Sequence, residues 1–163
     1  MKNAYEYLVK DDLKSAAAEF AVDADFDMRA KWGLFLVGLL QGKVERYPTY
    51  LELRNFLEID IQFLIDNYKG DYVQRVVDCA DFFFEVNPES YKFIGRVFAA
   101  NGFEHEALHF LERGKSGFYR DPELHFILAG LHSVGGRPDA ARQALDTCLQ
   151  ILPGYYPAVM AKV

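Results

Sequence analysis

The segment that decides the fold is PESYKFIGRVFAANGFEHEALHFLERGKSGFYRD, residues 88–121, followed directly by PELHFILAGLHSVGGRPDAARQALDTCLQILPGY, residues 122–155. The two sequences superpose at a slide of 34 residues. The slide pairs Pro88 with Pro122, Ile94 with Leu128, Gly95 with Ala129, Gly102 with Gly136, Ala107 with Ala141 and Leu111 with Leu145. Small and apolar residues that recur at a fixed period are typical of stacked helix pairs. We therefore expect two successive helix pairs here.

The residue types of the repeat follow from helix packing. Two antiparallel helices approach closely only where side chains are small, so we expect Gly95 to face Ala107 and Ala129 to face Ala141. Gly102 and Gly136 stand where the first helix of each pair must end, in a conformation with positive φ. One pair cannot bury its apolar face alone, so stability must come from stacking against neighbours.

The rest of the chain also has a helical pattern, and no run alternates long enough to predict a strand. We expect helices over about 3–24, from about Trp32 to a stop at Gly42, from Pro48 to about Tyr68 with Gly70 as the breaker, and from Val73 to about Phe84. Sliding back 34 residues from the first clear unit places Leu57, Ile61 and Leu64 at core sites, whereas Asp60 stands opposite Ile94 and fits badly.

These patterns predict one all-α domain of helical repeats over residues 1–163, with about 8–9 helices. Residues 1–87 form its degenerate part, 88–121 and 122–155 are the clear units, and 156–163 begin a capping or truncated helix. A natural terminal cap should have a polar outer face. The apolar residues Val159, Met160, Ala161 and Val163 therefore favour a chain cut from a longer protein.

Composition excludes several classes of protein. The chain of 163 residues carries 24 acidic against 18 basic residues, a net charge of −6, which argues against a nucleic-acid partner. Cys79 and Cys148 lie in apolar helical patterns and are expected to be buried, reduced thiols. The first residues have no long apolar run, and the longest such run, Leu34 to Leu40, is far shorter than the roughly 20 residues that span a membrane. We expect a cytoplasmic protein without a membrane partner.

The repeat resembles that of the tetratricopeptide-repeat (TPR) family, whose pattern places aromatic, Leu-Gly, aromatic, Ala and Phe residues at fixed spacing. The first unit supplies Tyr91, Ile94-Gly95, Phe98, Ala107 and Leu111. The second supplies Leu128-Ala129, Ala141, Leu145 and the closing Pro153, and departs from the pattern at His125 and His132; Tyr119 stands where the first unit would have its closing Pro. The resemblance implies a right-handed superhelix of antiparallel helix pairs, and a non-catalytic scaffold that binds a protein or peptide.

In this family the first helix of each pair lines a concave groove. The resemblance therefore implies a partner-binding face made of Glu89, Lys92, Phe93, Arg96, Ala99, Ala100, Glu123, Phe126, Ile127, Gly130 and Ser133. Lys92 and Arg96 would form half of a basic clamp for a C-terminal carboxylate, but Phe126 and Gly130 occupy the matching sites of the next unit. A groove with a small basic spot and an apolar floor suits an extended or helical peptide better.

Three alternatives remain. His105-Glu106-Ala107-Leu108-His109 matches the H-E-x-x-H string of zinc hydrolases, with Glu123, His125 or His132 as a third ligand. Ala107 is a packing residue of the repeat, however, and the extended zinc pattern fails at Glu112, so we expect neither an enzyme nor a metal or cofactor site. The repeats would otherwise serve as a structural or dimerisation segment of a longer protein. A secretion-type chaperone is the remaining alternative, although its N-terminal pattern is not evident.

Overall fold

The computed structural model describes residues 2–43 and 48–161, and every regular element in these residues is helical. The chain divides into two compact units, Met1–Asn87 and Pro88–Val163. The division falls at Pro88, the first residue of the first clear repeat. None of the helices in the described ranges is long and apolar enough to cross a membrane.

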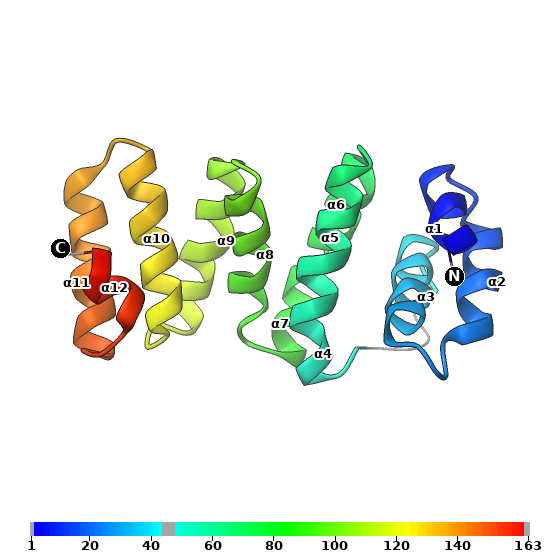
Figure 1. Ribbon diagram of the computed structural model, residues 1–163, viewed down its shortest axis with the longest axis horizontal. Helices are drawn as coiled ribbons and strands as arrows, with labels where there is room; N and C mark the ends of the chain where they lie inside the picture. Colours follow the sequence, from blue (N-terminus) through cyan, green and yellow to red (C-terminus); the bar gives the residue numbers. More distant parts are fainter. Residues whose placement is uncertain (1, 44–47, 162–163) are drawn as a thin grey trace. The chain divides into compact units, whose positions relative to one another are not determined.

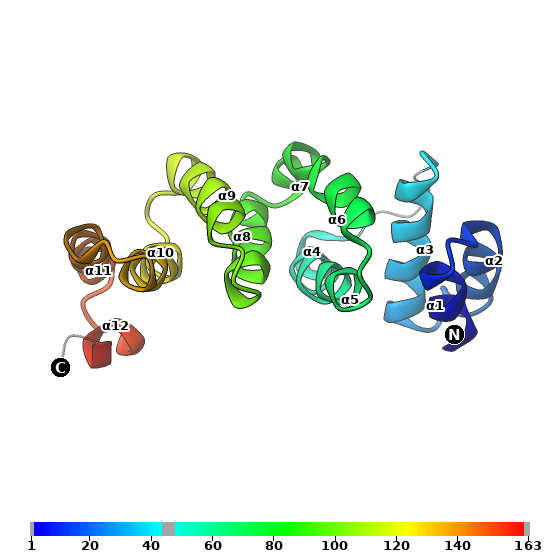
Figure 2. The same cartoon turned by 90° about the horizontal axis from the view of Figure 1, so that it is seen from above.

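The second unit consists of the two predicted helix pairs and one short helix. Its helices are α8 (Ser90–Ala100), α9 (Glu104–Gly117), α10 (Pro122–Val134), α11 (Pro138–Ile151) and α12 (Tyr156–Ala161). α8 packs on α9, α10 packs on α11, and α9 and α10 join the two pairs (Figure 1). Figure 2 views α10 and α11 close to end-on and shows α12 at one side of this pair. The predicted all-α, TPR-like helix pairs are therefore confirmed.

Glycines permit the close helix packing and the chain reversals that the repeat predicts. A Cβ built on Gly95 would lie 2.6 Å from Cγ of Leu111 and 3.4 Å from the carbonyl oxygen of Ala107. α8 and α9 can approach this closely only because residue 95 has no side chain. Gly102 and Gly136 follow the first helix of each pair with φ of 76° and 74°. Both glycines thus adopt the left-handed conformation that reverses the chain.

The first unit is also built of packed helices. They are α1 (Lys2–Val9), α2 (Leu13–Asp23), α3 (Met28–Leu40), α4 (Tyr50–Asn55), the π-helical turn η1 (Phe56–Asp60), α5 (Ile61–Asp66), α6 (Gly70–Val77) and α7 (Ala80–Val86). Its core holds a cluster of aromatic rings, in which the Phe56 centroid lies 5.0 Å from that of Phe35 and 6.0 Å from that of Phe83. Of the run Phe82 to Phe84, only Phe83 is fully buried, and Phe82 is 43% exposed.

The described residues form eleven separate helices, more than the 8–9 expected, when the continuous stretch of α4, η1 and α5 is counted as one helix. The difference arises from two breaks within predicted helices. The predicted helix over 3–24 is broken at Asp11, which adopts a φ of 65°, and a second break separates α6 from α7 at Asp78 and Cys79. Tyr68, with a φ of 61°, interrupts the helical backbone before α6. Gly70, which was expected to be the helix breaker, is the first residue of α6. Neither Asp11 nor Tyr68 is a glycine, so composition did not reveal these two turns.

The C-terminal helix α12 has one buried and one exposed side. Ala158 is fully buried, whereas Tyr156, Val159 and Met160 are exposed. Val163, the last of the apolar residues that the sequence analysis noted in this segment, lies outside the described residues. Apolar side chains are therefore solvent-accessible on this helix.

Candidate functional site

The eleven residues implied by the resemblance lie on or beside α8 and α10. All of them except Phe93 separate into two sets. Glu89 is the N-cap of α8, and Glu123 lies in the first turn of α10. Together with Lys92 and Arg96 they form an ion-pair cluster at the N-terminal ends of these two helices. Most of the remaining residues border apolar hollows further along the same helices. Phe93 does neither, because it is a core residue with 2% of its surface exposed.

Lys92 is the centre of the ion-pair cluster. Its ammonium nitrogen lies 2.9 Å from Oε1 of Glu89, 2.6 Å from Oδ2 of Asp121 and 3.0 Å from Oε1 of Glu123. The residue is only 5% exposed. An ammonium group has three N–H donors, and each of them has a carboxylate here. Lys92 therefore has no donor left for a ligand.

The pKa values of this cluster follow from the same contacts. Burial acts against the charge of Lys92, but hydrogen bonds to Asp121, Glu89 and Glu123 outweigh it and raise the pKa of the amine. Burial likewise acts against ionisation of Glu123, while the hydrogen bond and charge of Lys92 and the charge of Arg96 lower the pKa of that carboxyl. Nη1 of Arg96 lies 2.9 Å from Oε2 of Glu123. Both charged forms are thus stabilised by their neighbours.

Asp121 links this cluster to the backbone, and the sequence analysis did not single it out. As N-cap of α10 it accepts hydrogen bonds through Oδ1 from the backbone N–H groups of Glu123 (3.0 Å) and Leu124 (3.4 Å), while Oδ2 binds Lys92. An Asp directly before Pro122 at the first helical position is a helix-start signal that was present in the sequence. Only the fold shows that Lys92 uses the other oxygen.

The first apolar hollow begins one helical turn beyond the ion pairs. It has a volume of about 420 Å³ and is lined by Ala99, Ala100, Gly102, Glu104, Ile127, Gly130, Leu131 and Val134. Ala99 follows Arg96 by three residues and Ile127 follows Glu123 by four, so charges and hollow share one face of α8 and α10. The edge contributed by α9 carries Glu104, whose Oε1 lies 2.6 Å from Nη2 of Arg137. Four of the residues implied by the resemblance therefore come together here.

A second apolar hollow adjoins the first at Gly130. It has a volume of about 370 Å³ and is lined by Phe126, Ala129, Gly130, Ser133, Ala141, Arg142, Leu145 and Ala161. Ala161 belongs to α12, and the ring of Phe126 lies 5.8 Å from that of Tyr155 just before this helix. We call these two hollows together the α10 groove. Ala129 and Ala141, expected to face each other, line the same hollow.

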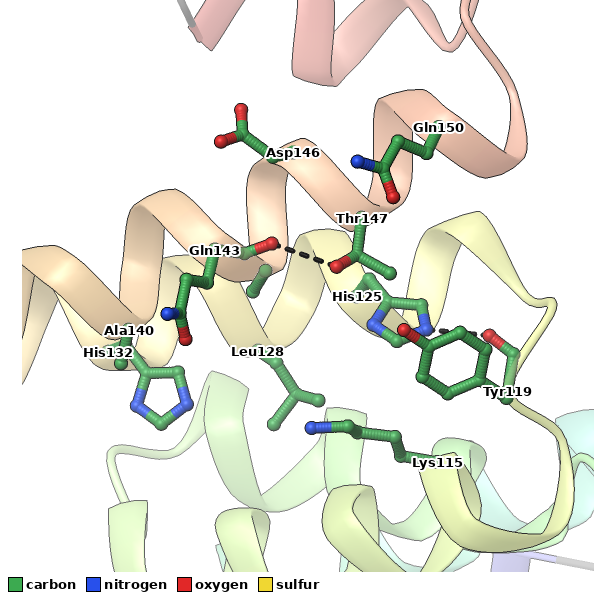
Figure 3. Close-up of a pocket in the computed structure, with 11 residues that line it drawn as sticks. Lys115, Tyr119, His125, Leu128, His132, Ala140, Gln143, Asp146, Thr147 and Gln150 are labelled. Carbon is green, nitrogen blue, oxygen red and sulfur yellow. Dashed lines mark hydrogen bonds between the residues drawn. The ribbon is translucent and has the colours of Figure 1, made fainter.

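A third hollow, of about 540 Å³, lies on α9 to α11 and is polar (Figure 3). Its residues were not among those predicted to bind a partner. Nε2 of His125 lies 2.6 Å from the carbonyl oxygen of Tyr119, so this nitrogen carries the proton and donates it. Nδ1 of His132 accepts a hydrogen bond from Nε of Arg137 at 3.0 Å. The two histidines that replace the repeat's aromatic residues thus hold the connections at the two ends of α10.

His105 and His109 do not meet a third metal ligand. Both are exposed on α9, where they border a hollow with Leu108, Glu112, Arg113 and Ser116. His125 and His132 are engaged as described above, and Glu123 belongs to the ion-pair cluster. Within residues 2–43 and 48–161 no group of three or more His, Cys, Asp or Glu side chains is arranged to hold a metal ion. The string is therefore a pair of surface imidazoles in this structure.

Comparison with known proteins supports the fold and goes no further. Neither a protein-family model nor a curated protein matches the sequence. Among solved structures, the chain is similar to YrrB, described as a TPR protein with an unusual peptide-binding site. The similarity has a TM-score of 0.50 at 16% sequence identity and covers 98% of this chain and 88% of the other. The fold is thus TPR-like.

Proposed function

We propose that this protein is a non-catalytic scaffold that binds a peptide or a segment of a partner protein in the α10 groove. The observation that carries the proposal is Gly130. It lies inside α10 and lines both hollows. A glycine in the interior of a helix costs about 1 kcal/mol relative to alanine, so its presence calls for a reason.

The fold itself gives no such reason. Gly130 is not among the residues with positive φ. A Cβ built at this position would have no atom within 4 Å, so no neighbouring side chain requires the missing one. Glycine is used where a backbone must leave room for a close approach, including that of a ligand. A glycine that leaves the groove open is best explained by something that enters the groove.

The similarity to YrrB supports this reading at the level of fold, and that protein is described as having a peptide-binding site. Apolar grooves on helical scaffolds bind peptides through buried apolar side chains. The proposed role uses packing and ion pairs alone and needs no metal or cofactor.

The test uses Gly130→Leu with Gly130→Ala as the matched control. Both substitutions remove the helix-breaking glycine, and neither meets a clash at Cβ, but only the leucine side chain fills the groove. Partners are captured from lysate of the source organism by each variant and by wild type, and identified by mass spectrometry. A partner lost by Gly130→Leu and retained or only weakened by Gly130→Ala, whose single Cβ takes up less of the groove, supports groove binding. If the leucine variant captures the same partners as wild type, the proposal fails.

A second candidate role is self-association through α12. The observation that favours it is the exposure of Tyr156 (70%), Val159 (40%) and Met160 (53%) on this helix. Sedimentation velocity over a range of concentrations tests it. A dimer that is abolished by Met160→Lys and retained by Gly130→Leu would place the interface on α12 and away from the groove.

A further inference from the structure

The chemistry of the ligand can be inferred from the charges at the edge of the α10 groove. Four cations border or adjoin it, and each already has a carboxylate partner in the described part of the chain. Lys92 has Glu89, Asp121 and Glu123, Arg96 has Glu123, Arg137 has Glu104 at 2.6 Å, and Arg142 has Asp139 at 2.9 Å. Each of these cations thus has a carboxylate partner within the chain, and among them only Lys92 is nearly buried, whereas the Arg142–Asp139 pair is exposed.

A carboxylate ligand meets two obstacles at this edge. All three N–H donors of Lys92 already have carboxylate partners, so a ligand carboxylate could bind Lys92 only by displacing Glu89, Asp121 or Glu123. The positive end of α10 is equally occupied, because Asp121 already accepts hydrogen bonds from the backbone N–H groups of Glu123 and Leu124. Displacing Asp121 would leave a nearly buried carboxylate unpaired, which is strongly unfavourable.

A cation meets the opposite situation. Counted together with Asp121, the ion-pair cluster holds three carboxylates, those of Glu89, Asp121 and Glu123, against the two cations Lys92 and Arg96, which gives a formal charge of −1. The side chains of Glu89 and Glu123 are 31% and 28% exposed, so solvent reaches them. An ionised carboxylate has about four lone-pair sites, and the exposed part of each of these two carboxylates can accept a hydrogen bond from solvent or from a ligand. The exposed carboxylates of the cluster are therefore accessible to a cation, whereas Lys92 has no donor left for an anion.

We propose that the α10 groove takes an apolar peptide segment that carries a lysine or arginine at the end lying over the first turns of α8 and α10. This inference rests on the proposed function and deepens it. The apolar side chains occupy the hollows around Gly130. One turn of α10 before Ile127, the cation lies over Glu123, whose carboxylate shares the Lys92 ammonium group with that of Glu89. The protein's net charge of −6 adds a favourable long-range field for such a partner.

The probes are three fluorescein-labelled peptides with one apolar core sequence. One has lysines at both ends, one has glutamates at both ends, and one has neutral ends and a free C-terminal carboxylate, while the first two are amide-capped. Binding is followed by fluorescence anisotropy at low and high salt. We expect the lysine-flanked peptide to bind most tightly, and its advantage to shrink as salt screens the charges.

Glu89→Gln locates the effect, since it removes one charge and keeps an oxygen acceptor for Lys92. It should weaken the lysine-flanked peptide about two- to fivefold, the range of an exposed ion pair, and leave the free-carboxylate peptide unchanged or bound more tightly. Glu112→Gln on α9 is the control, because this glutamate does not line the α10 groove and forms an exposed ion pair with Lys115.

The outcomes separate the inference from the function on which it rests. If all three peptides bind equally, or an anionic peptide binds most tightly, and Gly130→Leu abolishes that binding, the groove binds peptides and the inferred charge preference is wrong. If no peptide binds at any salt concentration, the groove does not bind peptides of this kind and both proposals fall.

Discussion

Lys92 of α8 and Asp121, the N-cap of α10, form a nearly buried ion pair in which Nζ lies 2.6 Å from Oδ2. Their side chains are 6% and 8% exposed. The pair joins the first helix of one repeat to the first helix of the next. A residue that the TPR resemblance assigned to ligand binding thus stabilises the stacking of the repeats.

Replacement of Lys92 by methionine is expected to destabilise the second unit. The substitution keeps the length of the side chain and leaves three carboxylates facing one another without their common cation. Loss of one partner from a buried ion pair costs about 3–5 kcal/mol. Denaturant unfolding followed by circular dichroism measures the change. Lys115→Met is the control, since the Lys115–Glu112 pair is exposed and 3.6 Å long, and should change stability by less than about 1 kcal/mol. Equal effects of the two substitutions would contradict a structural role of Lys92.

The same cluster predicts loss of stability in acid. The pKa of Glu123 is lower in the folded chain than its usual 4.5. Its contribution to stability is therefore fully present above the unfolded value and disappears as pH falls through the lower folded value. Melting temperatures measured between neutral and acidic pH should fall less steeply for Glu123→Gln than for wild type. A variant that lost stability in acid as steeply as wild type would show that Glu123 is not coupled to Lys92.

Two glycine-to-alanine substitutions in the second unit should have opposite effects. At Gly95 the new Cβ would lie 2.6 Å and 2.9 Å from Cγ and Cδ2 of Leu111, and overpacking of this kind costs about 1–3 kcal/mol. At Gly130 the new Cβ meets no atom within 4 Å, and the gain in helix propensity is up to about 1 kcal/mol. Denaturant unfolding of both variants provides the comparison. Stabilisation by Gly95→Ala would contradict the close approach of α8 and α9.

The first unit should become more stable as pH falls from 7 toward 4. Asp60, on the π-helical turn, is 1% exposed and neither of its oxygens has a hydrogen-bond partner, while Nη2 of Arg29 lies 3.7 Å away. Burial raises the pKa of this carboxyl to about 7, against the opposing charge of Arg29. The folded state therefore binds more protons than the unfolded state between about pH 4 and 7, and stability declines as pH rises through this window.

Asp60→Asn should remove this dependence and raise the stability of the first unit above pH 7. The size of the gain is on the order of a few kcal/mol, because each unit of pKa shift corresponds to about 1.4 kcal/mol. Trp32 is the only tryptophan and is buried in the first unit, so its fluorescence reports the unfolding of this unit. Asp71→Asn, at an exposed aspartate of α6, is the control. An unchanged pH profile in Asp60→Asn would show that another group titrates.

Asp60 also shows how far the repeat pattern reaches. The slide that aligns the two clear units places it opposite Ile94, a core site, and it is indeed buried. The pattern therefore identified the anomalous residue, but its neighbours Arg29 and Tyr5 lie on α3 and α1. Nη2 of Arg29 approaches the Tyr5 hydroxyl at 2.7 Å. No periodicity in the sequence relates these residues, because they belong to different helices and meet only when the helices pack.

The 34-residue pattern is enough to predict that this protein consists of helix pairs, where the clear pairs begin and end, and which glycines permit the close approach and the turns. It could do so because packing distance and backbone conformation restrict the residue at each repeat position. It did not determine the breaks at Asp11 and Tyr68, where residues other than glycine adopt positive φ. That Lys92 is an internal ion-pair partner and that Gly130 lines two hollows became visible in the packed fold, because charge partners and empty space depend on side chains brought together from separate helices.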